Sequence, residues 1–199
     1  EHLETRWMAD PDTSGDRFAA YLREAVEYAN QLIHGYSQAH PEVRGMGTTV
    51  TAAGVHDTRL FLAQIGDSRA YLVRGGRAFQ LTKDQSLTQR LVDAGELTEE
   101  EAEASARRNI ILQALGPDAR VKVVLSTEPL RRGDILLLCS DGLSNLVRRD
   151  ELAQFTAEHA DLAGLCSALI EAANERGGPD NITIVAANPF EFDSRFLRS

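Results

Sequence analysis

Residues 50–81 read VTAAGVHDTRLFLAQIGDSRAYLVRGGRAFQL. The stretch holds four short apolar runs separated by turn-forming residues, and the runs are 50–55, 60–65, 70–73 and 78–81. The links between them hold two to four turn-forming residues (56–57, 66–68 and 74–77), whereas a parallel crossover needs about a dozen residues or more. The stretch therefore predicts antiparallel β-hairpins.

The residues before this stretch have a helical period. Apolar side chains recur at steps of three and four, at Phe18, Leu22, Ala25, Val26, Ala29, Leu32 and Ile33. This spacing places them on one face of a helix. Thr13, Ser14 or Asp16 can cap the start of that helix, and Gly35 is predicted to end it.

Residues 86–116 are charged and thinly apolar, so they predict a surface excursion from the sheet. A short helix is expected first, and Gly95 stops it. Thr98 and Glu101 have the spacing of a capping box, which predicts a second, acidic helix.

The remaining residues predict two strands, two helices and a last strand. The strands at 121–125 and 135–139 come first, and the second is apolar throughout, as expected for a strand buried on both faces. Asp150 is expected to cap the first helix, while Gly177-Gly178 ends the second. A strand at 182–187 and a frayed tail from residue 188 complete the chain.

The composition allows a core and excludes several partners. Of the 199 residues 43% are hydrophobic, enough for one α+β domain over residues 1–199, with antiparallel sheets covered by helices. The net charge of −9 makes nucleic acid and anionic membrane surfaces poor partners. No apolar run has the roughly 20 residues that span a bilayer, and residues 1–8 have no signal-peptide layout. Cys139 and Cys166 lie in apolar stretches and predict buried thiols in the cytoplasm.

Three aspartates occupy turns beside predicted strands. Asp67 and Asp141 each follow a strand, and Asp180 precedes the last one. If these strand ends share one rim, three carboxylates meet there and repel one another unless cations are bound. Hard oxygen ligands suit Mg²⁺, Mn²⁺ or Ca²⁺ rather than zinc. Aspartate beside glycine or asparagine is also ordinary turn chemistry, so spacing alone leaves a purely structural role open.

A series of short motifs runs from about residue 45 to residue 187. The motifs are GTT (47–49), IGDSRAY (65–71), LTKD (81–84), AGELT (94–98), QALG (113–116), GD (133–134), LCSDGL (138–143) and GGPDNIT (177–183). In this order and spacing they resemble the metal-dependent protein phosphatases, the PPM or type-2C family, in their bacterial form.

The resemblance implies an antiparallel β-sandwich between helices, in four layers (α-β-β-α), with a metal-filled cleft at one end. It implies hydrolysis of phosphoserine and phosphothreonine in proteins by a water molecule that Mg²⁺ or Mn²⁺ activates. Asp141 and Asp180 match ligands of two central ions, and Asp67 matches a residue that helps hold a weaker third ion. Residues 86–116 correspond to the flap beside the cleft. The implied partners are a phosphorylated protein substrate and a kinase or its target.

Residues 1–45 match none of the family's upstream motifs. Upstream of the first helix, members of the family carry early strands, a phosphate-binding arginine, an aspartate in an Asn-Gln/Glu-Asp motif and an Asp-Gly-x-Gly-Gly motif whose aspartate bridges the two central ions. Either the numbering begins within a longer protein, or the shortened chain is genuine and lacks these strands. We expect the 199-residue chain by itself to have little phosphatase activity and to self-associate through bared sheet edges. The alternative function is a non-catalytic regulatory or phosphoprotein-binding module.

Overall fold

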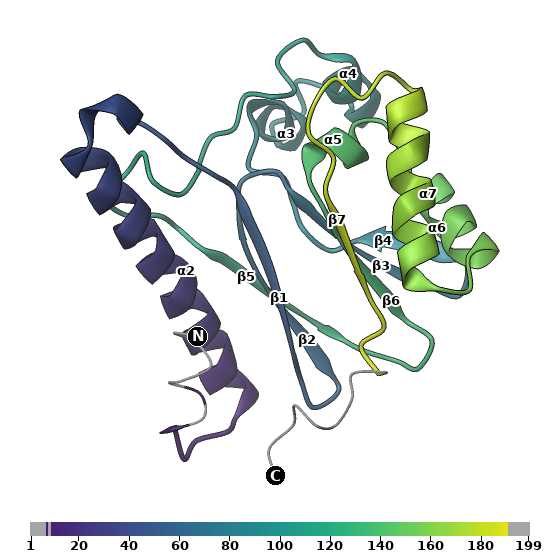
Figure 1. Cartoon of the computed structure of the whole chain (residues 1–199), viewed down its shortest axis with the longest axis horizontal. Helices are drawn as coiled ribbons and strands as arrows, with labels where there is room; N and C mark the ends of the chain where they lie inside the picture. Colours follow the sequence, from purple (N-terminus) through teal and green to yellow (C-terminus); the bar gives the residue numbers. More distant parts are fainter. Residues whose placement is uncertain (1–6, 8, 191–199) are drawn as a thin grey trace. The chain divides into compact units, whose positions relative to one another are not determined.

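The computed structural model of the chain describes residues 7 and 9–190 (Figure 1). The chain divides into two compact units. Unit 1 comprises Glu1–Asp67 and Asp84–Glu128, and unit 2 comprises Ser68–Lys83 and Pro129–Ser199. Each unit contains one antiparallel sheet and its own hydrophobic core. The expectation of a single domain over the whole chain stays a prediction.

Unit 1 is built on one long helix and a three-stranded sheet of order β1-β2-β5. Its elements are α2 (Gly15–Ala39), η1 (Pro41–Val43), β1 (Val50–His56), β2 (Arg59–Ile65), α3 (Leu87–Asp93), α4 (Glu99–Ala104) and β5 (Val124–Pro129). The register of the β1–β2 hairpin runs from Val50 opposite Ile65 to His56 opposite Arg59, as the short link predicts.

The core of unit 1 lies between α2 and the sheet. The apolar stripe of α2, with Phe18, Leu22 and Val26 at helical spacing, packs against alternate residues of β2 such as Phe61. Gly54 of β1 lies under the ring of Phe18, where an added Cβ would be 2.5 Å from the ring. A larger residue at position 54 would therefore force the buried Phe18 ring to shift.

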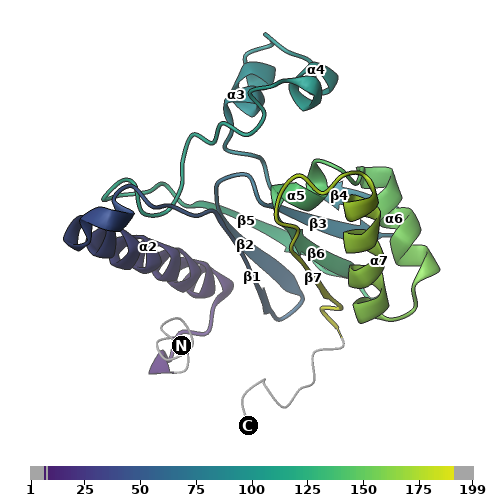
Figure 2. The same ribbon diagram turned by 45° about the horizontal axis from the view of Figure 1, so that its top comes forward.

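The predicted flap is a pair of short helices in unit 1. Figure 2 shows α3 and α4 next to each other and away from α2. The capping box predicted at the start of α4 is confirmed: Glu101 N donates to Thr98 Oγ1 at 3.1 Å, and Thr98 N donates to Glu101 Oε2 at 2.8 Å. These reciprocal bonds satisfy two amides that a helix start leaves without partners.

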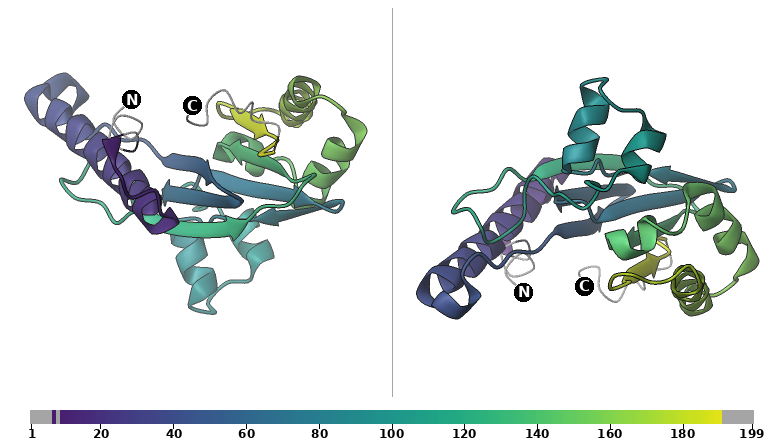
Figure 3. Two further views of the ribbon diagram at one scale, coloured as in Figure 1. Left: turned by 90° about the horizontal axis from the view of Figure 1, so that it is seen from below. Right: turned by 90° about the horizontal axis from the view of Figure 1, so that it is seen from above.

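Unit 2 has a four-stranded sheet of order β4-β3-β6-β7 with helices over one face. Its elements are β3 (Arg69–Arg74), β4 (Arg77–Gln80), β6 (Ile135–Cys139), α5 (Asp141–Ser144), α6 (Arg149–Glu158), α7 (Leu162–Glu175) and β7 (Ile184–Ala187). Figure 3 shows α6 and α7 side by side over this sheet. Leu165, Leu169 and Ala173 of α7 pack on Leu137 and its neighbours in the central strand β6.

The predicted fold class is confirmed, because two antiparallel sheets are flanked by helices in an α+β arrangement. The prediction that Gly35 ends the first helix is wrong. The helix continues to Ala39. Hydrogen bonds hold it on both sides of Gly35, between His34 Nδ1 and Gly116 O before it and from Gly45 N to Ser37 Oγ after it. Tertiary contacts here outweigh the weak helix propensity of glycine.

Several boundaries after residue 120 also differ from prediction. Asp150 lies inside the first turn of α6, because Glu151 accepts from Arg148 N and Arg148 becomes the cap residue. The strand expected at 121–125 runs instead from Val124 to Pro129, and the last strand starts at Ile184 rather than 182. The short helix α5 was not predicted.

Two further expectations concern the thiols and the ends of the chain. Cys139 is buried as predicted, but Cys166 is only half-buried on α7. The tail expected to fray from residue 188 falls, beyond Phe190, outside the described residues. In the part of the chain that the structure describes, no helix combines the length and apolar character needed to cross a bilayer.

Candidate metal centre

Asp141 lies at a change of direction between strand and helix in unit 2. The central strand β6 ends at Cys139, Ser140 keeps an extended backbone (φ −73°, ψ 165°), and Asp141 begins α5. The side chain of Asp141 is half-buried, and within the described part of the chain its Oδ2 accepts one long hydrogen bond, of 3.5 Å, from Asn145 Nδ2. The carboxylate is therefore held at the end of a buried strand with spare capacity to bind a cation.

Asp180 lies in the turn that joins α7 to β7. Gly177 (φ +108°) and Gly178 (φ +45°) allow the chain to leave the helix in a conformation that larger residues rarely adopt. Asp180 Oδ1 accepts a hydrogen bond of 2.7 Å from the amide of Asn181, which fixes the carboxylate relative to its own turn. Asp180 is exposed.

The two aspartate turns touch each other. A Cβ added at Gly142, the residue after Asp141, would lie 2.3 Å from the carbonyl oxygen of Asn181, the residue after Asp180. The hydroxyl of Ser140 donates to the same carbonyl at 3.1 Å. Residues that are about forty positions apart in sequence therefore form one local structure at the end of the β6–β7 pair.

A salt bridge between Arg176 and Glu151 links the end of α7, where the Asp180 turn begins, to α6. Arg176, directly after α7, donates through Nη1 to Leu146 O at 2.6 Å and to Glu151 Oε2 at 2.9 Å, and its Nη2 also contacts Glu151. The hydrogen bonds from Arg176 lower the pKa of the Glu151 carboxyl below its ordinary value. Arg176 thus ties the start of the Asp180 turn to the segment after α5.

Asp67 belongs to unit 1 and is buried, with 9% of its surface exposed. It follows Gly66 (φ +98°), where a Cβ would lie 2.4 Å from the side chain of Thr49. Gln85 makes two hydrogen bonds to this turn. Its main-chain N donates to Gly66 O at 3.0 Å, and its side-chain Oε1 accepts from Gly66 N at 2.9 Å. Gln113 Nε2 in turn donates to Gln85 Oε1 at 3.0 Å.

Ser140, Arg176 and Gln85 were not singled out by sequence analysis as residues that hold these turns. The partners of Ser140 are 41 and 43 positions away, and those of Arg176 are 25 and 30 positions away. A local sequence pattern carries no signal for such contacts. Their positions within or beside the SDG, GGPDN and LTKD motifs are the only indication in the sequence.

The donor chemistry of the two unit 2 turns fits a hard divalent cation. Both side chains are carboxylates, and within the described residues neither forms an ion pair with lysine or arginine. Mg²⁺ and Mn²⁺ prefer such oxygen ligands but need about six of them. Over residues 7 and 9–190 the structure gathers no group of three or more His, Cys, Asp or Glu side chains that could hold a metal ion. The meeting of Asp67, Asp141 and Asp180 around metal ions stays a prediction.

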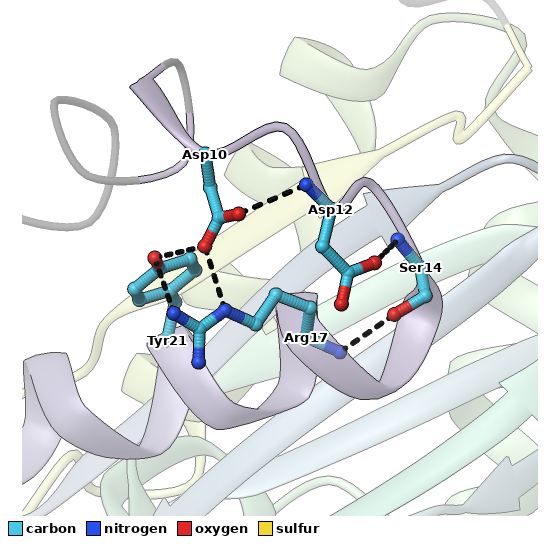
Figure 4. Close-up of polar contacts among 5 residues, drawn as sticks. All are labelled: Asp10, Asp12, Ser14, Arg17 and Tyr21. Atoms are coloured by element: carbon cyan, nitrogen blue, oxygen red, sulfur yellow. Dashed lines mark hydrogen bonds and ion pairs between the residues drawn. The ribbon is translucent and has the colours of Figure 1, made fainter.

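A second acidic cluster lies before α2 and has a structural explanation. Asp10 accepts hydrogen bonds from Arg17 Nε at 2.7 Å, from Asp12 N at 2.9 Å and from the hydroxyl of Tyr21 (Figure 4). These bonds lower the pKa of Asp10 to about 2, the largest effect coming from Tyr21. The carboxylate is thus used to fix the chain before the helix.

Comparison with known proteins identifies relatives along most of the chain. The family model for protein phosphatase 2C matches residues 2–174. The serine/threonine protein phosphatase PstP of Mycobacterium tuberculosis is 41% identical over 184 residues, which are 92% of this chain and 35% of that protein. Protein phosphatase PhpP of Streptococcus pneumoniae is 41% identical over 179 residues, 89% of this chain and 70% of that protein.

A solved structure extends the likeness to three dimensions. The catalytic domain of the serine threonine protein phosphatase PstP, in complex with two manganese ions, has a TM-score of 0.80 and 37% identity; the match covers 94% of this chain and 76% of that one. The chain spans about a third of the length of the mycobacterial relative. The motif series of the sequence, the two antiparallel sheets and these matches agree: the chain belongs to the protein phosphatase 2C family.

Proposed function

We propose that the protein hydrolyses phosphoserine and phosphothreonine in other proteins, using a water molecule activated by bound Mg²⁺ or Mn²⁺. The observation that carries the proposal is the contact between the Asp141 and Asp180 turns at one end of the unit 2 sheet. Neither carboxylate has a cationic partner among residues 7 and 9–190. Family membership and the names of the relatives support the same activity. They favour an enzyme over a non-catalytic module.

In this proposal Asp141 and Asp180 hold the central ions, and Asp67 helps to hold a weaker third ion. The structure of a relative with two manganese ions supports the choice of metal. Two-metal sites supply an activated water and neutralise the charge on the transferred phosphoryl group. The residues of this chain contribute fixed negative charge on short turns, so the carboxylates need little reorganisation when they bind a cation.

The partners follow from this activity. The substrate is a protein that carries phosphoserine or phosphothreonine, and a kinase or its target is the expected functional partner. The cytoplasm is the expected location. Pairing between copies through the edge strands β1 and β7 is a further part of the proposal, supported by the position of both strands at the ends of their sheets and by Val185, which is 55% exposed.

The proposal is tested by measuring phosphate release from a phosphothreonine peptide with increasing Mn²⁺. The protein is assayed both as the 199-residue chain and together with any natural sequence that flanks it. A phosphotyrosine peptide and an excess of chelator serve as controls. Metal-dependent hydrolysis of the phosphothreonine peptide supports the proposal, and absence of hydrolysis in every form of the protein overturns it.

A further inference from the structure

Ser140 occupies the cap position before α5, but its hydroxyl does not cap that helix. A serine at this position ordinarily accepts a hydrogen bond from an amide in the first turn. As at any helix start, the main-chain carbonyl of Ser140 accepts from the first turn, here from Leu143 N at 3.2 Å and Ser144 N at 3.3 Å. The hydroxyl makes no bond to the helix and is available for a different contact.

That hydroxyl completes the β6–β7 ladder. Ser140 N donates to Thr183 O at 3.0 Å, which continues the antiparallel register beyond the last strand pair, Cys139 and Ile184. The reciprocal bond in such a ladder would run from Thr183 N to the carbonyl of Ser140, which is already engaged by α5. Thr183 N donates instead to Ser140 Oγ at 3.0 Å.

The same hydroxyl also donates to Asn181 O at 3.1 Å, so one side chain both accepts from and donates to the segment after Asp180. Ser140 immediately precedes Asp141, and Asn181 immediately follows Asp180. Each aspartate is therefore adjacent in sequence to one end of the Ser140 Oγ–Asn181 O hydrogen bond, which joins the two turns. The missing side chain at Gly142 permits this approach, because a Cβ there would overlap Asn181 O.

We infer that Ser140 is a positioning residue, whose hydroxyl sets the separation of the Asp141 and Asp180 carboxylates for a bound divalent cation. The inference rests on the proposed function. Asn181 and Thr183 are exposed, so water can replace the hydroxyl as a hydrogen-bond partner when it is removed. Loss of the hydroxyl should therefore change the fold little, while the two turns become less well fixed relative to each other.

The inference is tested by titrating Mn²⁺ alone into the purified protein in a calorimeter, without substrate. The Ser140→Ala variant should bind Mn²⁺ at least about tenfold more weakly than the unmodified protein, as is typical when a group that orients a metal ligand is lost. Its thermal midpoint should fall by no more than about 3 °C. Hydrogen exchange at the amide of Thr183 should become faster.

Two variants and one control separate positioning from general damage. Ser140→Thr keeps the hydroxyl and should retain Mn²⁺ affinity within about threefold, whereas Ser140→Cys keeps the shape with a weak hydrogen-bonding group and should lose affinity. The matched control is Thr156→Ala, which removes a hydroxyl that donates to Leu152 O at 2.7 Å on α6, and it should bind Mn²⁺ normally.

The outcomes are distinct. Unchanged Mn²⁺ affinity in Ser140→Ala overturns this inference and leaves the proposed function intact. An equal loss of Mn²⁺ affinity in Ser140→Ala and Ser140→Thr also overturns it, because the hydroxyl is then not the cause. A loss of Mn²⁺ affinity in Ser140→Ala or Ser140→Cys that comes with a fall in thermal midpoint well beyond about 3 °C overturns it as well, because the effect is then one of folding. Absence of Mn²⁺ binding by the unmodified protein, both as the 199-residue chain and with any natural flanking sequence, overturns the proposed function and this inference together.

Discussion

Arg74 and Asp134 form a two-pronged ion pair inside unit 2. Arg74 Nε donates to Asp134 Oδ1 at 2.8 Å, and Nη2 donates to Oδ2 at 2.7 Å. Asp134 has no exposed surface and also accepts from the amide of Arg131 at 2.7 Å. Burial by itself raises the pKa of Asp134, but the hydrogen bonds from Arg74 and Arg131 outweigh it, and the pKa lies below its ordinary value.

Replacing Arg74 should destabilise the protein by removing the charge that this buried carboxylate needs. Arg74→Met is expected to lower the free energy of unfolding by about 3 kcal/mol, at the lower end for a broken buried pair because Arg74 keeps 21% of its side chain exposed. Urea denaturation followed by circular dichroism measures this. Arg132→Met, an exposed arginine in the same turn, should stay within about 0.5 kcal/mol of the unmodified protein. Equal effects of the two substitutions would show that the ion pair does not carry the difference.

The Asp10 cluster predicts an acid-dependent loss of stability. The pKa of Asp10 is about 2 in the folded protein and close to its ordinary 3.8 when the chain is unfolded. The unfolded state therefore binds more protons between these values, so this contribution is fully present above about pH 4 and is lost as the pH falls toward 2. Unfolding free energy measured across this range should decline less steeply in Asp10→Asn than in the unmodified protein.

Tyr21→Phe tests the same cluster from its other side. The substitution keeps the Asp10 carboxylate and removes the hydroxyl that has the largest effect on its pKa. The decline of stability between about pH 4 and 2 should therefore again become less steep. A decline as steep as that of the unmodified protein in both variants would show that the cluster around Asp10 is not its source.

The strands could be predicted from sequence because their signal is local. Residues 50–81 alternate apolar runs with short turns, and the β1–β2 and β3–β4 hairpins have the expected antiparallel register. The hairpin expected across residues 66–68 is wrong, because β2 and β3 belong to different sheets. The pairing of β6 with β7 was not predictable in the same way, because the three helices α5, α6 and α7 separate them in the chain. The contact between the Asp141 and Asp180 turns depends on that pairing. The sequence therefore identified the two aspartates as candidates, but only the family resemblance related them to each other.

Gly35 shows the limit of local rules in the opposite direction. The residue is a reasonable helix end by propensity, yet α2 runs through it because Asn30, His34 and Ser37 make long-range hydrogen bonds on either side. Such contacts cannot be read from a window of neighbouring residues. A helix that persists through a glycine pays an entropic cost of roughly 0.5–1 kcal/mol relative to alanine.

That cost gives a stabilising substitution. Gly35 is exposed, and an added Cβ would meet no atom within 4 Å, so Gly35→Ala should raise the free energy of unfolding by about 0.5–1 kcal/mol. Gly116→Ala is the contrasting control, since its φ is +105° and its Cβ would lie 2.5 Å from Met46 O; it should destabilise by more than about 1 kcal/mol. Urea denaturation of both variants tests the pair. A Gly35→Ala protein less stable than the original would mean that α2 is not continuous through residue 35.

The proposed ligands give the last prediction. Asp141→Asn and Asp180→Asn keep the size of each side chain but remove its charge, so each should abolish nearly all metal-dependent turnover of a phosphothreonine peptide. Asp67→Asn should leave measurable turnover and raise the Mn²⁺ concentration for half-maximal rate, as expected for a weaker third ion. Asp161→Asn is the matched control, because Asp161 caps α7 by accepting from Gly164 N at 2.7 Å and asparagine caps helices equally well. Full turnover in Asp180→Asn would place the metal centre elsewhere, and a loss in Asp161→Asn as large as that in Asp141→Asn would show that the effect reports folding of unit 2 rather than metal binding.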